Sequence, residues 1–558
     1  MDTYLVIGTV IVGLFVLIFA KEAYDSKKKY KKIIDKAEAS FGHKSDRKYT
    51  QDELDNIKHM FYRSMNEDSI DDITAGDLEI DDIFMAYNNC LSAPGSEYFY
   101  YRLRNPEYDD KKLEAFEKKV EFVRTDVTSR RLLEKAFLKI GGLRQANFYD
   151  CLDYFDNIER KPLIKEYITI ALFILSVVLT CINPGQFVFF LVLVLVYNII
   201  SYYSARGTIE SYVVCMKYIV NFIGCSEELC KSAIPELSDD YAEIFDAVSK
   251  LSRLKKRSGL LNSSNATGAG NPMDLLADYL RMFFHVDIIR FYHMLDELNK
   301  NRDEIERLYF LLGRLEGYVA CASFREAQPS YCIPESGKGI KAVNVYHPMI
   351  SNPVKNSIDT EKCVLITGSN ASGKSTFLKT IALNAIFART VHICMADSFV
   401  LDDYHIFSSM SLRDDLMNED SYFMVEIKAL KRIFDYADAN PQKKVLCFVD
   451  EVLRGTNTIE RIAACTKIME NISGRGIMCF AATHDIELTE LLEEEYINYH
   501  FDEQILENDI VFNYELKTGR ATSRNAIKLL SIMGFSDDIV SRAQDMAERF
   551  ISEKVWKK

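Results

Sequence analysis

An uncharged stretch of 39 residues, from 167 to 205, limits what this chain can fold into more than any other feature. As a single helix with a rise of about 1.5 Å per residue it would be about 58 Å long, near twice the thickness of about 30 Å of a bilayer's hydrocarbon core. The turn-forming run Asn183-Pro184-Gly185-Gln186 interrupts it. The stretch therefore predicts two membrane-spanning helices, 167–182 and 187–203, that make up a hairpin over 167–203. The alternative is a buried hairpin in the core of a soluble protein.

A second apolar run, residues 3–20, lies at the N-terminus and is followed by Lys21 and five more lysines between 27 and 32. A cleavable signal peptide would place basic residues before the run and small residues at a cleavage site, so this order favours a membrane anchor with a cytoplasmic basic flank. Lys161, Lys165 and Arg206 flank the predicted hairpin, and both of its ends are therefore expected in the cytoplasm. The predicted protein is a multi-pass protein of the cell membrane with three spans.

Composition excludes several classes of protein. The 558 residues are 48% hydrophobic and 27% charged, the proportions of a folded chain. The 68 basic and 82 acidic residues give a net charge of −14, which excludes a generally basic nucleic-acid-binding surface but not a local one such as the run 250–257. That run is equally typical of a solvated helix face or a lipid-facing patch. The thirteen cysteines have no framework spacing and no CxxC pair, which predicts reduced thiols in a cytosolic body.

The rest of the chain divides by residue pattern. Residues 21–80 are polar and of mixed charge, which indicates a connector, whereas 81–165 and 204–335 carry apolar residues at helical spacing and predict the two parts of an all-α core domain. A Gly-, Ser- and Asn-rich linker interrupts the second part at 258–272. From about 340 to 520, predicted strands alternate with helices, at 363–367, 391–394, 445–449, 477–481 and 510–514. This alternation predicts a mainly parallel, doubly wound α/β domain.

A phosphate-binding loop follows the first of these strands. The run Gly368-Ser369-Asn370-Ala371-Ser372-Gly373-Lys374-Ser375 fits G-x-x-x-x-G-K-[ST], and a predicted helix opens at Thr376. The glycines let the backbone curl so that its N–H groups face phosphate oxygens, and the helix N-terminus adds positive potential. We therefore expect residues 368–376 to bind the phosphates of ATP, with Lys374 at the β- and γ-phosphates and the Ser375 hydroxyl on Mg²⁺.

Two further strand ends supply candidate catalytic groups. Asp450 and Glu451 follow the predicted strand 445–449, where an aspartate can hold Mg²⁺ and the adjacent glutamate can activate the attacking water as a general base. His484 follows the strand 477–481 and could sense or polarise the γ-phosphate, although a lone histidine is more often structural. The pattern predicts an ATPase site with Lys374, Glu451 and His484 as catalytic residues and Ser375 and Asp450 as magnesium ligands.

In this order and spacing, the segments GSNASGKST, VDEVLRGTNT and AATHDIELTELLE resemble the ATPase domain of the MutS family, which recognises DNA mismatches. The segment 412–426 is similar to the MutS loop that completes the ATP site of the neighbouring subunit, which implies that Ser421 approaches the partner's γ-phosphate. Residues 514–550 look like the family's C-terminal dimerisation helices, so 521–558 is assigned to such a segment. The segments 88–123 and 277–327 are similar to parts of its core domain. The resemblance implies a dimeric P-loop ATPase of the ABC-like, MutS C-terminal type that uses ATP and Mg²⁺.

The chain also departs from the family. The mismatch-reading domain with its F-x-E wedge is missing, membrane segments replace it, and the lever and clamp that surround DNA look shortened or absent. The phosphate loop has Ser369, Ala371 and Ser372 where the family commonly has Pro and Met-Gly. The resemblance therefore implies ATP hydrolysis for this chain but does not imply mismatch recognition.

The sequence thus predicts a membrane-anchored, MutS-like homodimeric ATPase whose contact with DNA, if any, is not mismatch-specific. One alternative is a membrane scaffold that binds ATP without hydrolysing it, and the intact Lys374, Ser375, Asp450 and Glu451 argue against it. The other is a transporter ATPase, which would need an LSGGQ-like signature and about six spans in each half.

Overall fold

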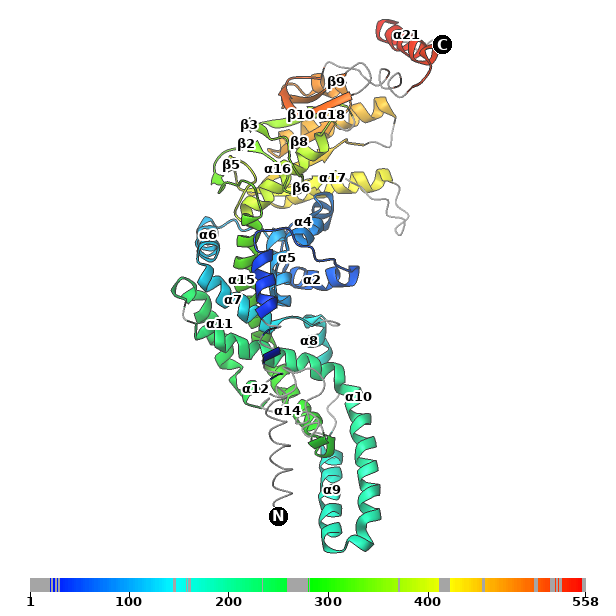
Figure 1. Ribbon diagram of the computed structural model, residues 1–558. Coiled ribbons are helices and arrows are strands. Elements are labelled where there is room, and N and C mark those ends of the chain that lie inside the picture. Colours follow the sequence, from blue (N-terminus) through cyan, green and yellow to red (C-terminus); the bar gives the residue numbers. More distant parts are fainter. Residues whose placement is uncertain are drawn as a thin grey trace. The chain divides into compact units, whose positions relative to one another are not determined.

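The computed structural model describes most of the chain: residues 21, 24–25, 28, 31–143, 147–156, 158, 162–232, 234–257, 279–280, 282–369, 372–410, 422–453, 457–505, 510–521, 527, 530 and 534–553 (Figure 1). The chain forms two compact units. The helical unit comprises Met1–Ser64, Met85–Tyr101 and Glu114–Ala327, and the sheet unit comprises Met65–Phe84, Arg102–Leu113 and Gln328–Lys558.

The helical unit is built from amphipathic helices, as the apolar spacing predicts. Its helices include α2 (Gln51–Ser64), α5 (Ala93–Arg104), α6 (Asp110–Thr125), α7 (Val127–Ile140), α8 (Phe148–Asp156), α9 (Ile164–Ile182), α10 (Pro184–Cys230), α11 (Ser238–Lys250), α12 (Ser252–Arg257), α14 (Val286–Lys300) and α15 (Arg302–Glu326), of which α5 ends and α6 begins in the sheet unit. Helix α15 approaches α5 closely at two glycines. A Cβ on Gly313 would lie 2.5 Å from the carbonyl oxygen of Pro94, and one on Gly317 would lie 2.4 Å from the ring of Tyr98. Only glycine permits this contact.

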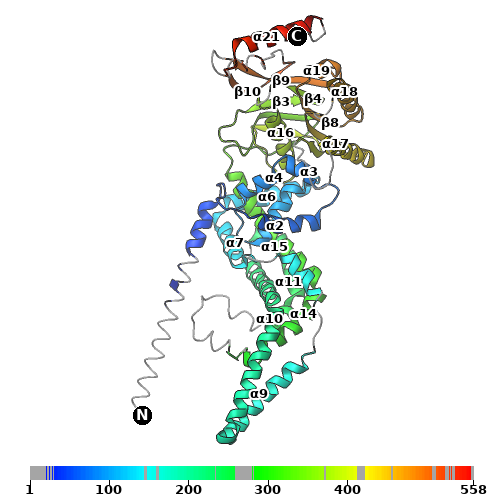
Figure 2. The same ribbon diagram turned by 90° about the vertical axis from the view of Figure 1, so that its right-hand side faces the viewer.

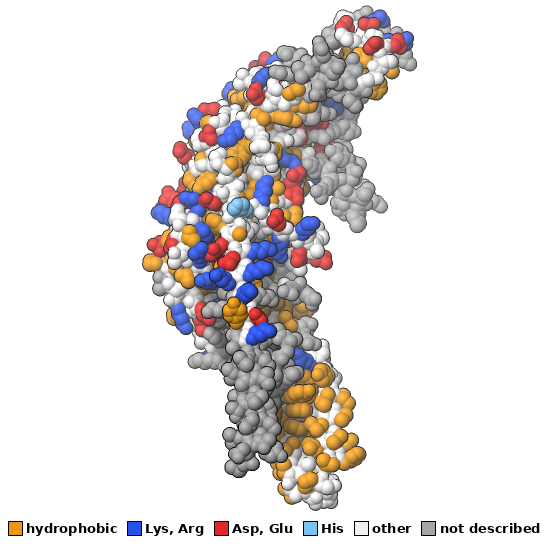
Figure 3. Space-filling view, in the orientation of Figure 1, with side chains coloured by type: hydrophobic (Ala, Val, Ile, Leu, Met, Phe, Trp, Pro, Cys, Tyr) orange, Lys and Arg blue, Asp and Glu red, His pale blue; other side chains and the backbone are white. Residues whose placement is uncertain are grey.

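The predicted apolar hairpin forms helices α9 and α10, which lie side by side in both views (Figure 2). Asn183 alone separates them, and Pro184 opens α10 at a position that needs no N–H donor. Both helices are long and apolar enough to cross a membrane, and 17% and 22% of their apolar windows are buried. Hydrophobic side chains gather on the surface of this hairpin (Figure 3), among them those of Ile182, Phe189 and Ile200. The described residues therefore contain two candidate spans, and the expected third, at 3–20, lies outside them.

Helix α10 is longer than the sequence predicts. It continues without a break from the apolar window to Cys230, 47 residues in all, because no proline or glycine pair ends it after residue 203. Its second half changes environment: Met216, Ile219 and Phe222 are buried in the helical unit. The same helix thus belongs both to the exposed hairpin and to the packed core.

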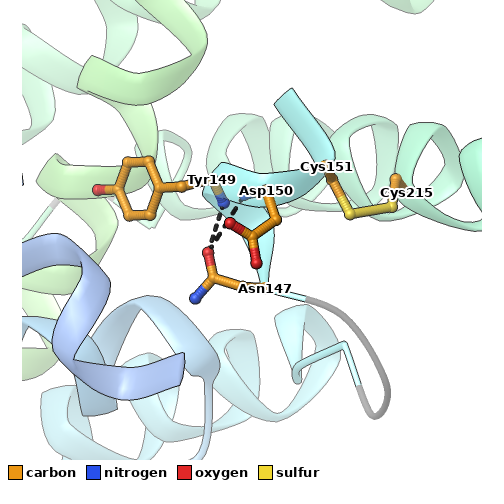
Figure 4. The surroundings of a disulfide bond; sticks show 5 residues. All are labelled: Asn147, Tyr149, Asp150, Cys151 and Cys215. Atoms are coloured by element: carbon orange, nitrogen blue, oxygen red, sulfur yellow. Dashed lines mark hydrogen bonds between the residues drawn. A yellow bond between two sulfur atoms is a disulfide. The ribbon is translucent and has the colours of Figure 1, made fainter. Parts of the chain in front are cut away.

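The prediction that the cysteines are reduced thiols is wrong for one pair. Cys151 of α8 and Cys215 of α10 form a disulfide, and their Cα atoms are 6.2 Å apart (Figure 4). The disulfide joins residues 64 positions apart, so no local spacing of cysteines predicts it. The other eleven cysteines, all in the described part of the chain, are not in disulfides. Beside the bond, Asn147 accepts hydrogen bonds from the backbone N–H groups of Tyr149 and Asp150 at the start of α8.

The sheet unit contains the predicted α/β domain. Its six-stranded sheet has the order β10-β9-β4-β8-β7-β6, formed by β10 (Ile510–Thr518), β9 (Tyr496–Ile505), β4 (Cys363–Thr367), β8 (Met478–Thr483), β7 (Lys444–Asp450) and β6 (Tyr404–Ser409). All neighbouring strands are parallel except β10 and β9. The helices of this unit include α3 (Asp72–Asp77), α16 (Lys374–Arg389), α17 (Tyr422–Ala439), α18 (Thr458–Gly474), α19 (Ile486–Leu491) and α21 (Asp537–Glu553), while α4 (Ile80–Tyr87) begins in it.

The strand predictions hold in part. The runs 363–367, 445–449, 477–481 and 510–514 lie in β4, β7, β8 and β10, except that β8 begins at Met478. The prediction of a strand at 391–394 is wrong, because this apolar run forms only an isolated bridge between Cys394 and Cys332. A second sheet was not predicted: its order is β1-β5-β2-β3, formed by β1 (Glu335–Ser336), β5 (Ser398–Leu401), β2 (Ile340–Val345) and β3 (Asn356–Thr360). Its strands are short and half-exposed, so they carry no continuous apolar run.

Part of the expected connector packs into the sheet unit. The side chain of Asp77 in α3 accepts hydrogen bonds from the Ser408 hydroxyl (2.6 Å) and the Met410 N–H (2.9 Å) at the end of β6. Arg432 of α17 reaches the carboxylate of Asp71, the N-cap of α3. The segment Met65–Phe84 therefore belongs to the structure that carries the predicted site rather than to a solvated link.

Candidate nucleotide-binding site

The predicted phosphate loop has the required strand–loop–helix geometry. Strand β4 is completely buried and ends at Thr367, and α16 begins at Lys374. Gly368 (φ +151°) and Gly373 (φ +105°) have backbone conformations that other residues rarely adopt. A Cβ on Gly368 would lie 2.8 Å from the Ser372 hydroxyl and 2.9 Å from the carbonyl oxygen of Phe501. The two glycines of the motif are thus needed for the loop to close.

Lys374 lies inside this loop. Its side chain is buried, and its ammonium group donates hydrogen bonds of 2.8 Å to the carbonyl oxygens of both Gly368 and Ser369. Ser375 and Thr376 are exposed on the first turn of α16, whereas Ser372 is buried. The predicted loop residues Asn370 and Ala371 lie outside the described residues. A positive charge therefore sits at the N-terminus of a helix, where anions bind favourably.

The predicted acidic and histidine residues meet at the same edge of the sheet. Strands β4, β8 and β7 are parallel neighbours, so the groups at their carboxyl ends come together. The His484 Nε2 is 2.7 Å from a carboxylate oxygen of Glu451 and 3.5 Å from the Lys374 ammonium nitrogen. Asp450 ends β7 directly before Glu451 and is buried. The structure thus brings together four residues that the sequence places up to 110 positions apart, whereas Ser421 lies outside the described residues.

The backbone around His484 is fixed on both sides. The Asp485 N–H donates to the Thr483 hydroxyl, and both Asp485 carboxylate oxygens accept hydrogen bonds from Arg461 of α18, at 3.0 and 2.6 Å. These bonds to Asp485 raise the pKa of Arg461 above its usual value. The imidazole therefore extends from a rigid strand end rather than from a free loop.

Two side chains could supply oxygen ligands for the expected magnesium ion. No group of three or more His, Cys, Asp or Glu side chains among the described residues could hold a metal by itself. The Ser375 hydroxyl and the Asp450 carboxylate are oxygen ligands, which Mg²⁺ prefers. Because Mg²⁺ usually keeps several waters and binds substrate phosphates beside one or two carboxylates, these two residues fit the ion.

A cavity next to the loop was not predicted from the sequence. It has a volume of about 390 Å³ and lies beside Gly373 and Thr376. Apolar and aromatic side chains from separate segments wall it, including those of Pro353, Phe377 and Tyr514. A flat aromatic group bound here would adjoin the phosphate loop. No local motif marks the cavity, because its walls come from β10, α16 and the segment before β3.

Tyr514 is held over the loop by an irregular strand. The pairing of β10 with β9 shifts between Phe512 and Leu516, and Tyr514 takes a left-handed conformation with φ +56°. Asn356 secures this bulge: its side-chain amide donates to the Tyr514 carbonyl (3.0 Å) and accepts from the Leu516 N–H (2.8 Å). The Tyr514 ring lies 3.1 Å from where a Cβ on Gly373 would be. The aromatic ring thus packs against the phosphate loop.

A second contact that sequence reasoning missed involves the loop itself. The Ser369 hydroxyl donates a hydrogen bond to the carboxylate of Glu503 in β9. Nothing in the local sequence links these residues, which are 134 positions apart. The bond ties the start of the loop to the strand beside β4.

The fold and the site are those of a P-loop nucleotide-binding domain. Residues 364–551 match the family described as MutS domain V. The chain is 30% identical over 279 residues to "DNA mismatch repair protein MutS 2" of Haloarcula marismortui, a match that covers 44% of this chain and 29% of that protein. It is 29% identical over 272 residues to the mismatch repair protein MutS of Fusobacterium nucleatum, covering 45% and 30%. For MutS of Thermotoga sp. the identity is 33% over 215 residues, covering 36% and 26%. The chain therefore matches less than a third of the length of these relatives.

Proposed function

We propose that this protein is a membrane-anchored ATPase that binds Mg·ATP in the sheet unit and hydrolyses it. The main support for this proposal is that Lys374, Glu451 and His484 lie together at the carboxyl ends of parallel strands. The His484 Nε2 is 2.7 Å from the Glu451 carboxylate and 3.5 Å from the Lys374 ammonium nitrogen. A cation, a carboxylate and an imidazole at one loop are the groups that phosphoryl transfer to water needs. The match of residues 364–551 to MutS domain V supports the same reaction.

Each residue has a distinct task in this mechanism. Lys374 neutralises charge on the β- and γ-phosphates, and the Ser375 hydroxyl and the Asp450 carboxylate hold Mg²⁺, which offsets the charge of the phosphate oxygens. Glu451 accepts the proton of the attacking water, and His484 orients the Glu451 carboxylate through its hydrogen bond. The cavity beside Gly373 takes the adenine base, with the Tyr514 ring against it.

The site is completed by a second copy of the chain in this proposal. The resemblance of 412–426 to a loop that reaches the neighbouring subunit's nucleotide supports a homodimer with two composite sites, in which Ser421 approaches the partner's γ-phosphate. ATP binding would then close the dimer and hydrolysis would release it. Helix α21 belongs to the segment assigned to dimerisation.

The apolar hairpin is the proposed membrane anchor. Helices α9 and α10 have mean hydropathies of 1.9 and 2.0 over their apolar windows, and most of those windows is exposed. Exposed apolar helices of this length are stable in a bilayer and unfavourable in water. With Lys165 and Arg206 at the ends of the hairpin, the sheet unit is assigned to the cytoplasmic side of the cell membrane.

DNA binding has less support than ATP hydrolysis. The matched relatives are named as DNA mismatch repair proteins, but the match covers only about 30% of their length. The net charge of −14 argues against a generally basic surface for sequence- or mismatch-specific contact. We propose that any DNA contact is nonspecific and salt-dependent. A titration of the detergent-solubilised protein with matched, mismatched and branched duplexes at two salt concentrations would test this, and tight mismatch-selective binding would contradict it.

The decisive experiment measures ATP turnover by the detergent-solubilised protein and its Glu451→Gln variant. Removing the general base should lower kcat by at least about 100-fold while Mg·ATP still binds. Glu460→Gln, which changes an exposed carboxylate in the first turn of α18, is the matched control and should keep wild-type turnover. A wild-type protein that binds ATP but does not hydrolyse it would instead be a nucleotide-dependent membrane scaffold.

A further inference from the structure

The loop that follows β7 has an unfavourable backbone conformation. Glu451 (φ +54°) and Leu453 (φ +59°) both lie in the left-handed region, although neither is glycine. Such conformations are unfavourable for residues other than glycine and persist only where the surroundings hold them. Because Glu451 is the proposed general base, whatever holds this loop also sets the position of its carboxylate.

Among the described residues, groups from β8, α18 and α17 hold the loop. The Glu451 N–H donates to the Ala482 carbonyl of β8 at 2.9 Å, and the Cys465 thiol of α18 contacts the Val452 carbonyl at 3.2 Å. The Leu453 N–H donates to a carboxylate oxygen of Glu426, a side chain from α17. This third anchor is a charged side chain, and it comes from helix α17 rather than from the P-loop or the strand ends that carry the predicted catalytic group.

Both partners of that third bond are buried. Leu453 is 3% exposed and Glu426 is 4% exposed, so water cannot replace the carboxylate as acceptor of the Leu453 N–H. A buried N–H without a partner is unfavourable, and the loop would move to satisfy it. The movement would start two residues from Glu451 and would change the 2.7 Å contact between Glu451 and His484.

We propose that Glu426 is a positioning residue for ATP hydrolysis: its hydrogen bond to the Leu453 N–H fixes the left-handed turn that aims Glu451 at the attacking water. The proposal rests on the proposed ATPase function and extends it to a residue outside the P-loop and the strand ends. Glu426 is not part of the lining of the base cavity, so its loss should affect the chemical step more than nucleotide affinity.

Two substitutions separate the acceptor from the bulk of the side chain. Glu426→Gln keeps an oxygen that can accept the Leu453 N–H, and its kcat should stay within about 3-fold of the wild type. Glu426→Met has a similar size but no acceptor, and its kcat should fall at least about 10-fold with KM for ATP changed less than about 2-fold. Glu426→Asp, which shortens the side chain by one methylene, should also lower kcat. Asp435→Ala, which removes an exposed carboxylate from the same helix, is the control and should change neither constant.

A double-mutant cycle distinguishes a positioning role of Glu426 from a purely structural one. If Glu426 acts through Glu451, then Glu426→Met in the Glu451→Gln background should cost no further activity, because the general base is already lost. Turnover is expressed per site that binds Mg·ATP, and thermal unfolding is recorded for each variant, so a loss of folded protein does not count as a loss of kcat.

The outcomes are distinct. Wild-type kcat in both Glu426→Met and Glu426→Asp, equal losses in Glu426→Gln and Glu426→Met, or additive losses in the double mutant would each overturn the assignment of Glu426. A wild-type chain without turnover would overturn the proposed ATPase and this assignment together. Turnover that needs Glu451 but not Glu426 would overturn this assignment alone.

Discussion

Replacing Tyr514 with alanine should weaken the binding of ATP but not the binding of its phosphates alone. The Tyr514 ring lies against Gly373 and walls the cavity of about 390 Å³ that is proposed to take the base. Tyr514→Ala removes this aromatic surface and leaves the phosphate loop, Lys374 and the magnesium ligands in place.

The structure also limits the size of the effect. The Tyr514 side chain is 44% exposed, so only part of the ring can contact a bound base. An aromatic pair contributes about 0.5–1.5 kcal/mol beyond the area that it buries. This corresponds to a Kd for ATP that is about 2- to 13-fold weaker in the variant.

The assay is an equilibrium titration with Mg·ATP in the Glu451→Gln background, where hydrolysis does not deplete the ligand. Inorganic tripolyphosphate, which has the phosphates but no base, is the comparison ligand, and Tyr514→Phe, which keeps the ring, is the control variant. Tyr514→Phe should bind ATP as the parent does. An unchanged Kd for ATP in Tyr514→Ala, or an equal loss for tripolyphosphate, would refute the reasoning.

Two further predictions concern stability. Burial raises the pKa of Glu97, whose carboxylate accepts from the Tyr309 hydroxyl, to about 8. A folded-state pKa above the unfolded one favours folding at low pH, so the contribution of Glu97 to the free energy of unfolding falls by up to about 1.4 kcal/mol per pH unit between about pH 5 and 8. Urea unfolding across this range should therefore be less pH-dependent in Glu97→Gln than in the wild type. Equal pH dependence in the two proteins would contradict the raised pKa of Glu97. Asp77→Ala removes a buried acceptor from Ser408 and Met410 and should lower the free energy of unfolding of the sheet unit by about 2–4 kcal/mol, whereas Asp77→Asn, which keeps an acceptor oxygen, should lose less. A loss below about 0.5 kcal/mol in Asp77→Ala urea unfolding would show that these bonds do not hold the segment.

Much of the site was predictable because its chemistry is local. The glycines of the phosphate loop, Lys374 and Ser375 follow one strand within eight positions, and steric limits on glycine make that spacing specific. Asp450 and His484 were recognisable as the residues that end buried apolar strands. Parallel strands present their carboxyl ends at one edge, so the order of the elements was enough to predict that these groups meet.

The residues that were missed depend on pairings across long stretches of chain. Tyr514 faces the loop because a bulge in β10, held by Asn356, turns it there. Glu426 reaches the Leu453 N–H from a helix that gives no chemical signal in its sequence. The disulfide joins two helices that periodicity alone could not bring together.

Residue types within short segments were enough to predict the apolar hairpin, the helical spacing of the core and the nucleotide loop. Which distant side chains share the site, and that Met65–Phe84 packs into the sheet unit, became known from the packed fold. These contacts follow from strand order, a strand irregularity and the docking of helices. Such arrangements depend on the packing of the whole unit, which no short segment of the chain encodes.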